Sequence, residues 1–243
     1  YFRIILIESI NDNKELGITY MLKPNFIKIQ NFINIILKKK ELSYEKSKSL
    51  ITQFQVLNNI NPDETEENQK TLIRDFLKNT FGYKINTSGD IDWAIFNELN
   101  KVEVIIEVKR IINESEMVNK EDFLRKAFFE TILYFMQERN QGNIDLKHII
   151  ITNVHTWFII DASEYERIFW NNKIFRQRFL DWKNKKTLND TTEFFYFSIA
   201  KPFCEFLINT RRESLFDDIY NELIEVTSFT LKELNYNNSE NNL

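Results

Sequence analysis

Two short apolar runs, Ile91–Phe96 and Val102–Val108, constrain the fold of this chain more than any other feature. Both are rich in β-branched residues and are separated by the turn-like residues 97–100, which predicts two paired antiparallel strands. The second run contains three consecutive apolar residues, 104–106, which is typical of a strand buried on both faces. Such a strand needs cover above and below it, so the sequence predicts an α/β fold.

Glycine and proline are scarce, and this favours long helices around a modest sheet. Only 4 Gly and 3 Pro occur in 243 residues, too few for the turns of an all-β fold. We expect a central mixed sheet of four or five strands flanked by helices, with helical N-terminal and C-terminal extensions. The chain then divides into a helical N-terminal region (1–60), an α/β core (61–200) and a helical connector with a tail (201–243).

Apolar periodicity predicts the individual elements. The expected helices are two within 24–58, one at 64–79, one at 120–139, further segments up to 186, and two at about 201–209 and 214–234. Further strands are expected at 148–152, 157–160 and 194–199.

Charge, cysteine content and hydropathy exclude several classes of protein. The net charge of −4 argues against a module that holds nucleic acid by bulk positive charge, but not against a nuclease. The single Cys204 cannot form an internal disulfide and is expected in the core, which suits the cytoplasm. No apolar run is long enough to span a bilayer, so we expect no membrane partner. The chain begins with Tyr1, which suggests a fragment of a longer protein.

The residues that carry chemistry follow the two predicted strands. Glu107 and Lys109 lie two positions apart, so their side chains share one side of the strand, and Asp92 starts the neighbouring strand. Two adjacent carboxylates repel each other unless a cation neutralises them, and Mg²⁺, with Mn²⁺ as a substitute, prefers such oxygen ligands. A lysine beside them could orient or deprotonate the attacking water and stabilise transition-state charge. This set predicts phosphodiester hydrolysis.

At these residues the sequence resembles the PD-(D/E)xK nuclease superfamily. Its signature is an Asp at the start of one strand and Glu-x-Lys on the next, matched here by Asp92 and by Glu107-Val108-Lys109, although Ile91 stands where the family label has Pro. The resemblance implies a restriction-endonuclease-like fold. It also implies Asp92, Glu107 and the backbone carbonyl of Val108 as metal ligands, with Lys109 as the catalytic lysine.

Two further features agree with the resemblance. Family members often carry a Glu on the preceding helix, and Glu66 or its neighbour Glu67 occupies that place as a catalytic candidate. The helix after Glu-x-Lys carries Gln-x-x-x-Tyr in one branch of the superfamily, and here Glu130 and Tyr134 share that spacing and one helix face. The alternative for Glu66 and Glu67 is a favourable interaction with the dipole at the helix N-terminus. The alternative for Glu130 and Tyr134 is ordinary helix packing.

More narrowly, residues from about 60 to 170 resemble the N-terminal endonuclease domain of single-chain, type IIG-like restriction-modification enzymes. The resemblance implies double-stranded DNA as substrate, a methyltransferase and target-recognition region missing from this chain, and a transient dimer. Neither an Asn-Pro-Pro-Tyr element nor a Gly-rich cofactor loop occurs in the sequence.

A basic segment at 167–186 holds seven basic residues against one acidic residue, with aromatic residues between them. It is either a helix that contacts DNA phosphates or a helix with a core-facing aromatic side and solvated charges. The candidate DNA contacts are Lys173, Arg176, Arg178 and Lys183.

Outside the enzyme class, the alternative is a catalytically silent DNA-binding or interaction domain, in which Asp92, Glu107 and Lys109 form a structural ion cluster. Within the enzyme class, a repair or mobile-element nuclease is the alternative. The two histidines, His148 and His155, have no Cys or acidic partner at zinc spacing.

Overall fold

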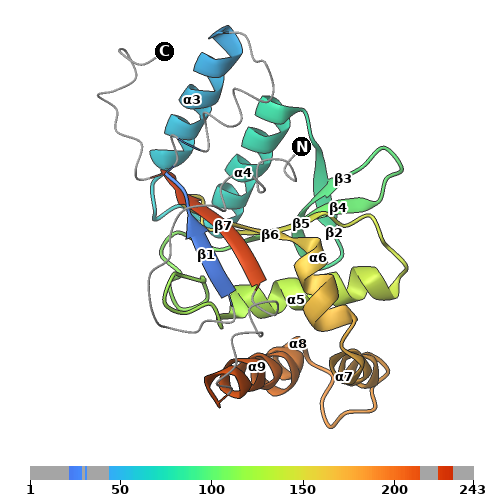
Figure 1. The fold of residues 1–243 in the computed structure, drawn as a ribbon. Helices are drawn as coiled ribbons and strands as arrows, with labels where there is room; N and C mark the ends of the chain where they lie inside the picture. Colours follow the sequence, from blue (N-terminus) through green and yellow to red (C-terminus); the bar gives the residue numbers. More distant parts are fainter. Residues whose placement is uncertain (1–21, 29–30, 32–43, 214–223, 232–243) are drawn as a thin grey trace.

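The computed structural model describes residues 22–28, 31, 44–213 and 224–231 (Figure 1). These residues form seven strands: β1 (Leu22–Phe26), β2 (Lys84–Ser88), β3 (Ile91–Phe96), β4 (Val102–Val108), β5 (His148–Thr152), β6 (Thr156–Asp161) and β7 (Ile224–Thr230). The helices are α3 (Tyr44–Asn58), α4 (Glu66–Phe81), α5 (Lys126–Asn140), α6 (Ala162–Tyr165), α7 (Lys173–Lys183), α8 (Thr192–Phe194) and α9 (Lys201–Glu213), with π-helical turns η1 (Glu166–Trp170) and η2 (Phe195–Ala200). None of these helices is long and apolar enough to cross a bilayer.

The strands form one mixed sheet in the order β1-β7-β6-β5-β4-β3-β2. The pairs β4–β5 and β1–β7 are parallel and the other neighbouring pairs are antiparallel. The C-terminal ends of β4 and β5 therefore lie at the same edge of the sheet as the start of β3, which is the usual edge for ligand sites in open α/β sheets.

The predicted hairpin at 91–108 is confirmed. Trp93 pairs with Ile106 and Ala94 with Ile105 in an antiparallel register, and Asn100 closes the turn with φ 61°. The Asn97 side chain caps this turn by accepting a hydrogen bond from the amide of Lys101. The strands predicted at 148–152 and 157–160 are confirmed as β5 and β6.

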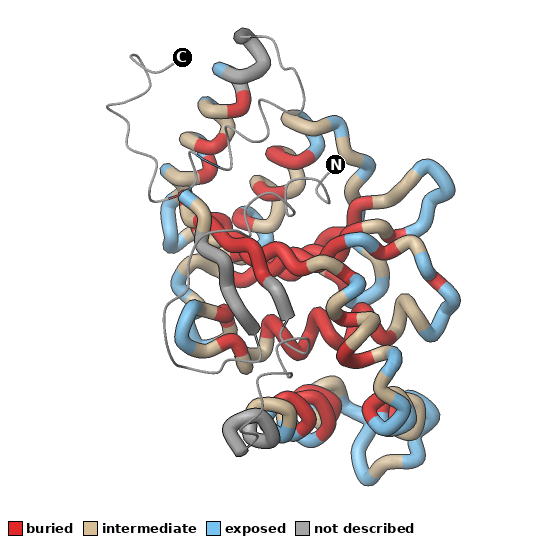
Figure 2. Tube along the Cα trace, in the orientation of Figure 1, coloured by how far each residue is buried: buried red, intermediate tan, exposed pale blue. Residues whose placement is uncertain are grey.

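Helices cover both faces of the sheet, so the predicted α/β class is confirmed. The helices α3 and α4 lie on one face, whereas α5 packs on β4 and β5 at the other, with η1, η2, α7 and α9 beyond it (Figure 1). The centre of the sheet and α5 are almost continuously buried (Figure 2). Phe54, Ile73 and Phe76 belong to one buried cluster, and Phe128, Phe135 and Phe169 to the other, so the sheet separates two cores.

The helix predicted at 64–79 is confirmed as α4, and its ends show why it forms there. The Thr65 side chain accepts a hydrogen bond from the Asn68 amide at the N-terminus. At the C-terminus Gly82 adopts φ 72°, a left-handed conformation that glycine reaches without strain. Ile73, Phe76 and Leu77 are buried on the predicted face.

The C-terminal predictions were partly wrong. Residues 194–199 form part of α8 and of η2 instead of a strand, because Phe195, Tyr196 and Ile199 are buried at helical spacing while Phe197 is exposed. The helix predicted at 214–234 is wrong over 224–230, where β7 pairs with β6 and β1. Residues 214–223 lie outside the described residues, as does the tail from 232.

The sheet has seven strands where four or five were predicted, since β1, β2 and β7 were missed. Residues 24–26 belong to β1 rather than to a helix, and most of the first predicted helix lies outside the described residues. The helix predicted from residue 120 starts at Lys126, because the side chains of Asn119 and Asp122 accept backbone hydrogen bonds that turn the chain before it. The sheet draws strands from all three predicted regions of the chain.

Candidate functional site

The Glu-x-Lys element is buried where β4 ends. Glu107 is 2% exposed and Lys109 is 6% exposed, and the Lys109 Nζ lies 2.8 Å from Glu107 Oε1. The Lys109 amide donates a hydrogen bond to the Thr152 carbonyl, so the residue continues the pairing of β4 with β5. Because the element is enclosed between β3 and β5, it is not an alternating charge pattern on a solvated strand face.

Asp92 lies beside this element at the start of β3. Its Oδ2 accepts a 2.9 Å hydrogen bond from the Val108 amide, which fixes the carboxylate against β4. The side chain of Val108 is fully buried. The structure therefore brings together Asp92, Glu107 and Lys109, the three residues on which the predicted chemistry depends.

Helix α4 adds a lysine that the sequence interpretation missed. The Lys70 Nζ lies 2.7 Å from Asp92 Oδ1 and 2.7 Å from Glu66 Oε1, and it bridges the two carboxylates. Glu67 is more remote, with an 84% exposed side chain 3.9 Å from the same ammonium group. Of the two candidate glutamates on this helix, Glu66 is the one connected to Asp92.

Buried hydrogen bonds attach the first turns of α4 to the hairpin. Gln69 is fully buried, and its Oε1 accepts from the Ile111 amide while its Nε2 donates to the carbonyls of Pro62 and Glu64. The Trp93 indole donates to the Lys70 carbonyl at 2.8 Å. These bonds place Lys70 and Glu66 at the edge of the sheet where β3 begins and where Asp92 lies.

Helix α5 supplies Glu130, which reaches the same lysine as Glu107. Glu130 is 8% exposed and its Oε2 lies 2.6 Å from the Lys109 Nζ. Glu116, from the irregular segment before α5, lies 3.5 Å from Lys109 and 3.1 Å from Lys126. Glu130 therefore belongs to the site, and Glu116 and Lys126 are members that the sequence interpretation missed.

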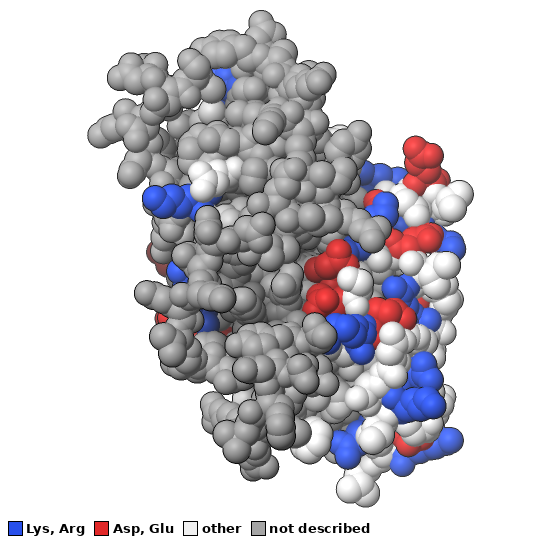
Figure 3. Space-filling model, in the orientation of Figure 1, with Lys and Arg blue, Asp and Glu red and all other residues white. Residues whose placement is uncertain are grey.

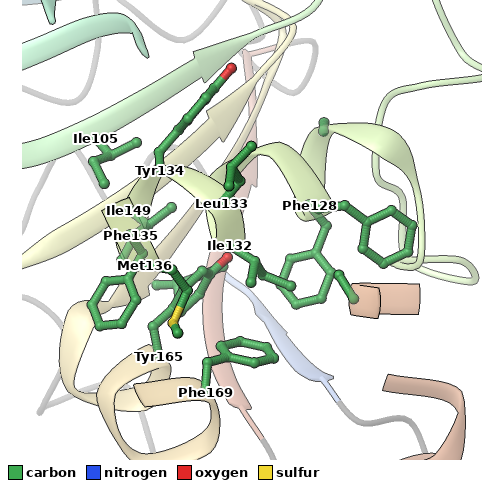
Figure 4. Close-up of a cluster of buried hydrophobic side chains, with 14 of the residues drawn as sticks. Ile105, Phe128, Ile132, Leu133, Tyr134, Phe135, Met136, Ile149, Tyr165 and Phe169 are labelled. Atoms are coloured by element: carbon green, nitrogen blue, oxygen red, sulfur yellow. The ribbon is translucent and has the colours of Figure 1, made fainter. Parts of the chain in front are cut away.

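Two tyrosines border this group of charges. Tyr134 extends from α5 toward the sheet with its hydroxyl directed away from the apolar cluster (Figure 4). Its pKa is raised by burial and by the negative charges of Glu107 and Glu130, so the hydroxyl keeps its proton. Burial and the charge of Glu130 likewise raise the pKa of Tyr196 in η2, another residue that was missed.

Burial governs the ionisation of the central pair. Burial raises the pKa of Glu107 well above its ordinary value, the Lys109 ammonium opposes this shift, and Glu130 and Asp92 add to it. Burial also disfavours the charged form of Lys109, but the adjacent Glu107 and Glu130 outweigh it and raise the pKa of the lysine. Lys109 is consequently an ammonium group at neutral pH.

The residues present fit a divalent cation. Glu107 Oε2 is buried and has no hydrogen-bond partner among the residues that the structure describes, whereas Oε1 contacts Lys109. The cluster also carries excess negative charge, since five carboxylates face three ammonium groups when the exposed Glu67 is left out. The members counted are Glu66, Asp92, Glu107, Glu116 and Glu130 against Lys70, Lys109 and Lys126. Hard oxygen donors with this charge excess suit Mg²⁺ or Mn²⁺.

The ligands implied by the resemblance are two carboxylates and a backbone carbonyl. The described part of the chain contains no group of three or more His, Cys, Asp or Glu side chains arranged to hold a metal ion. Asp92 Oδ1 can accept from Lys70 and still offer a lone pair, because an ionised carboxylate has about four acceptor positions.

The basic segment at 167–186 includes α7, which packs on η1 and η2 on the side of α5 away from the sheet (Figure 1). Its aromatic residues Phe175, Phe179 and Trp182 are buried, as the packing interpretation predicted. Arg176 stacks on Trp170 with 5.4 Å between the guanidinium and the ring centroid.

Three of the four candidate DNA contacts, Lys173, Arg178 and Lys183, are exposed. Basic side chains predominate over this part of the visible surface, at the lower right of Figure 3. Helix α5 separates this surface from the charged cluster.

A cavity of about 400 Å³ opens at the same edge of the sheet, further toward β1. Its lining includes Ile27, Lys120, Asn153 and Phe229 but none of the predicted catalytic residues. The segment before α5 lies between them, because Glu116 contacts Lys109 while the adjacent Met117 lines the cavity. The lining also includes the carboxylates of Glu114 and Glu121, whereas the buried contacts between carboxylates and Lys109 lie in the charged cluster.

Fold and cluster together define an α/β protein with a buried carboxylate–lysine network at one edge of a mixed sheet. The chain belongs to a family described as a domain of unknown function (DUF7149), whose model matches residues 27–241. No curated protein and no solved structure matches the chain.

Proposed function

We propose that this protein is a Mg²⁺-dependent DNA endonuclease related to the PD-(D/E)xK nucleases. The observation that carries the proposal is the buried Glu107–Lys109 pair with Asp92 held against the Val108 amide. The order of elements agrees with the one that the resemblance implies. Helix α4 precedes the strand β3 with Asp92, the strand β4 with Glu107 follows, and helix α5 comes next. This order supports a restriction-endonuclease-like core.

In this proposal Asp92, Glu107 and the Val108 carbonyl hold the metal ion. Bound Mg²⁺ supplies charge neutralisation at the scissile phosphate and activation of the attacking water. Lys109 orients this water and stabilises negative charge on the phosphate. Of the two roles expected for the lysine, the raised pKa favours charge stabilisation over that of a base.

Glu130 acts as a positioning residue for Lys109. Its carboxylate lies 2.6 Å from the ammonium group, and α5 holds it in the core. Tyr134 excludes water from the apolar side of the pair. The Glu that replaces Gln at position 130 gives the Lys109 ammonium group an ionised acceptor in place of an amide oxygen, which strengthens the contact with Lys109.

The wider proposal concerns the substrate and the biological setting. Double-stranded DNA would contact the cluster at the sheet edge and the exposed basic residues of α7. We propose the cleavage module of a type II restriction-modification enzyme, acting in the cytoplasm with a methyltransferase and a target-recognition region. Cleavage of both strands by one active site would use a transient dimer or two successive nicks. A repair or mobile-element nuclease has the same chemistry.

A second candidate function is a catalytically silent DNA-binding or interaction domain. One observation favours it: Asp92 and Glu107 each already contact a lysine ammonium group, as scaffold ion pairs do. Under this alternative the cluster stabilises the fold and has no requirement for metal.

Cleavage of supercoiled plasmid DNA with 10 mM Mg²⁺ distinguishes the two functions. The nuclease proposal expects nicked and linear products from the parent and none from Asp92→Asn or Glu107→Gln. Asp90→Asn is the matched control, because Asp90 is exposed in the turn before β3 and has no contact with the cluster in the described structure. Equal product formation by parent and both site variants would refute the proposed active site.

A further inference from the structure

Lys70 occupies a position where a cation bound at Asp92 would meet a like charge. Its ammonium group lies 2.7 Å from Asp92 Oδ1, and its side chain is 13% exposed. The Lys70 carbonyl accepts the hydrogen bond of the Trp93 indole, so the backbone of α4 is tied to the strand that carries Asp92. The contact is therefore set by the fold rather than by a mobile surface side chain.

The ammonium group has a second acceptor at the same distance. Glu66 Oε1 lies 2.7 Å away, one helical turn before Lys70, and its side chain is 40% exposed. Both contacts are already made, so the ammonium group can give up Asp92, whose side chain is 16% exposed, and keep the more exposed Glu66. A cation that approached Asp92 would repel the ammonium group toward Glu66.

We propose that Lys70 is an internal counter-ion that competes with the metal for Asp92, and that its charge transfers wholly to Glu66, which it already contacts, when the metal binds. This inference rests on the proposed function, because it assumes a metal at Asp92 and Glu107. Without metal, Lys70 neutralises Asp92 and holds it in the orientation set by the Val108 amide. With metal, the ammonium group gives up Asp92 and keeps its contact with Glu66, so Lys70 and Glu66 are positioning residues.

The Lys70–Asp92 contact has different effects on the metal-free and the metal-bound protein, and this difference gives a thermodynamic prediction. The Lys70–Asp92 contact stabilises the metal-free protein more than the metal-bound protein. Removing the lysine therefore lowers metal-free stability and raises metal affinity, as linkage requires. A lysine that positioned Asp92 equally in both states would leave the affinity unchanged or, when removed, lower it.

The test is calorimetric titration of Mn²⁺ into the full chain. We expect Lys70→Met to bind Mn²⁺ about tenfold more tightly than the parent, a usual size for coupling between two sites. The matched control is Lys126→Met, which removes the same charge from the cluster, but from Glu116 and Glu130 instead of Asp92. We expect this control to change affinity by less than about threefold, because its charge is more remote from Asp92. A lower or unchanged affinity in Lys70→Met overturns the inference.

Glu66→Gln gives a second test that does not depend on the stability of Lys70→Met. Without its second acceptor, Lys70 remains on Asp92 and Mn²⁺ binds more weakly. In a Lys70→Met background the same substitution has no effect. An equal loss in both backgrounds would instead make Glu66 a metal ligand and overturn the transfer.

The outcomes separate this inference from the proposed function. If the parent binds Mn²⁺ and Asp92→Ala does not, the metal site stands, and the Lys70 and Glu66 variants alone decide the inference. If the parent does not bind Mn²⁺, both are overturned. A fall in the melting temperature of Lys70→Met that is larger without metal than with saturating Mn²⁺, measured by circular dichroism, supports the inference independently of cleavage activity, and an equal fall in both states overturns it.

Discussion

Replacing Lys109 by methionine is expected to destabilise the metal-free protein by about 3–5 kcal/mol at neutral pH, the usual cost of removing one partner of a buried ion pair. Methionine keeps most of the aliphatic stem and removes only the ammonium group. That group lies 2.8 Å from Glu107 and 2.6 Å from Glu130, in a side chain 7% exposed. The variant removes the ammonium group that lies between these two carboxylates and leaves Glu130 with only the more distant Lys126, 3.9 Å away.

The cost depends on pH in a predictable direction. Burial, Glu130 and Asp92 raise the pKa of Glu107 above the ordinary 4.5, and Lys109 opposes them. A carboxyl group whose folded-state pKa is raised contributes stability below its unfolded pKa, and this contribution is lost as the pH rises through the folded pKa. Removal of Lys109 raises this pKa further. The stability that Lys109→Met loses relative to the parent should therefore be small near pH 4.5 and grow as the pH rises.

Thermal and urea unfolding, followed by circular dichroism with EDTA at pH 5 and pH 8, measures this deficit. For a chain of this size the expected loss at pH 8 lowers the melting temperature by on the order of 10 °C. Lys101→Met is the matched control, because Lys101 pairs with Asp145 at 3.6 Å on the surface, with a 48% exposed side chain. A loss of stability in Lys109→Met that is no larger than in this control, or that is the same at both pH values, would refute the proposed role of the buried ion pair.

Three further predictions concern other parts of the account. Lys109→Ala should reduce the Mg²⁺-dependent cleavage rate by about 10²–10³-fold while leaving Mn²⁺ binding largely intact, and equal cleavage rates would remove its catalytic role. Cys204 is fully buried, and burial raises the pKa of its thiol, so iodoacetamide should label it only after unfolding. Combined alanine substitution of Lys173, Arg178 and Lys183 should weaken DNA binding and reduce the slope of log K against log salt by up to about 3, as judged by fluorescence anisotropy. An unchanged slope would leave α7 without a role in DNA contact.

The part of the site that short-range geometry determines, Asp92, Glu107 and Lys109, could be predicted from the sequence. Alternating faces in a strand put Glu107 and Lys109 together, and a tight hairpin puts Asp92 beside them, so short-range geometry is sufficient. The capping residue Thr65 and the apolar face around Ile73 likewise identify α4 from local pattern.

Lys70 was missed although a local signal existed. It lies four residues after Glu66 and three before Ile73, so it shares the helix face that connects the candidate glutamate with the core. A charged residue in this place needs a buried partner, and Asp92 is that partner. The contact itself joins residues 22 positions apart, which periodicity does not show.

The remaining differences arise from long-range pairing. The segment Ile224–Thr230 becomes a strand because β6 and β1 pair with both of its edges. Tyr196 reaches the site through the π-helical turn η2, where packing on α5 overrides an aromatic-rich pattern that favours a strand. Glu116 belongs to an irregular segment, and no periodic signal marks it.

The most direct test of the account is whether Asp92 and Glu107 bind a divalent metal together. Mn²⁺ titrated to millimolar concentration into the parent, Asp92→Ala and Glu107→Ala, followed by calorimetry, answers this without dependence on missing domains or on a recognition sequence. We predict saturable binding by the parent and its loss in both variants, each shown to be folded by circular dichroism. Binding that is absent from the parent, or that persists in either variant, would contradict a metal-dependent nuclease site at this hairpin.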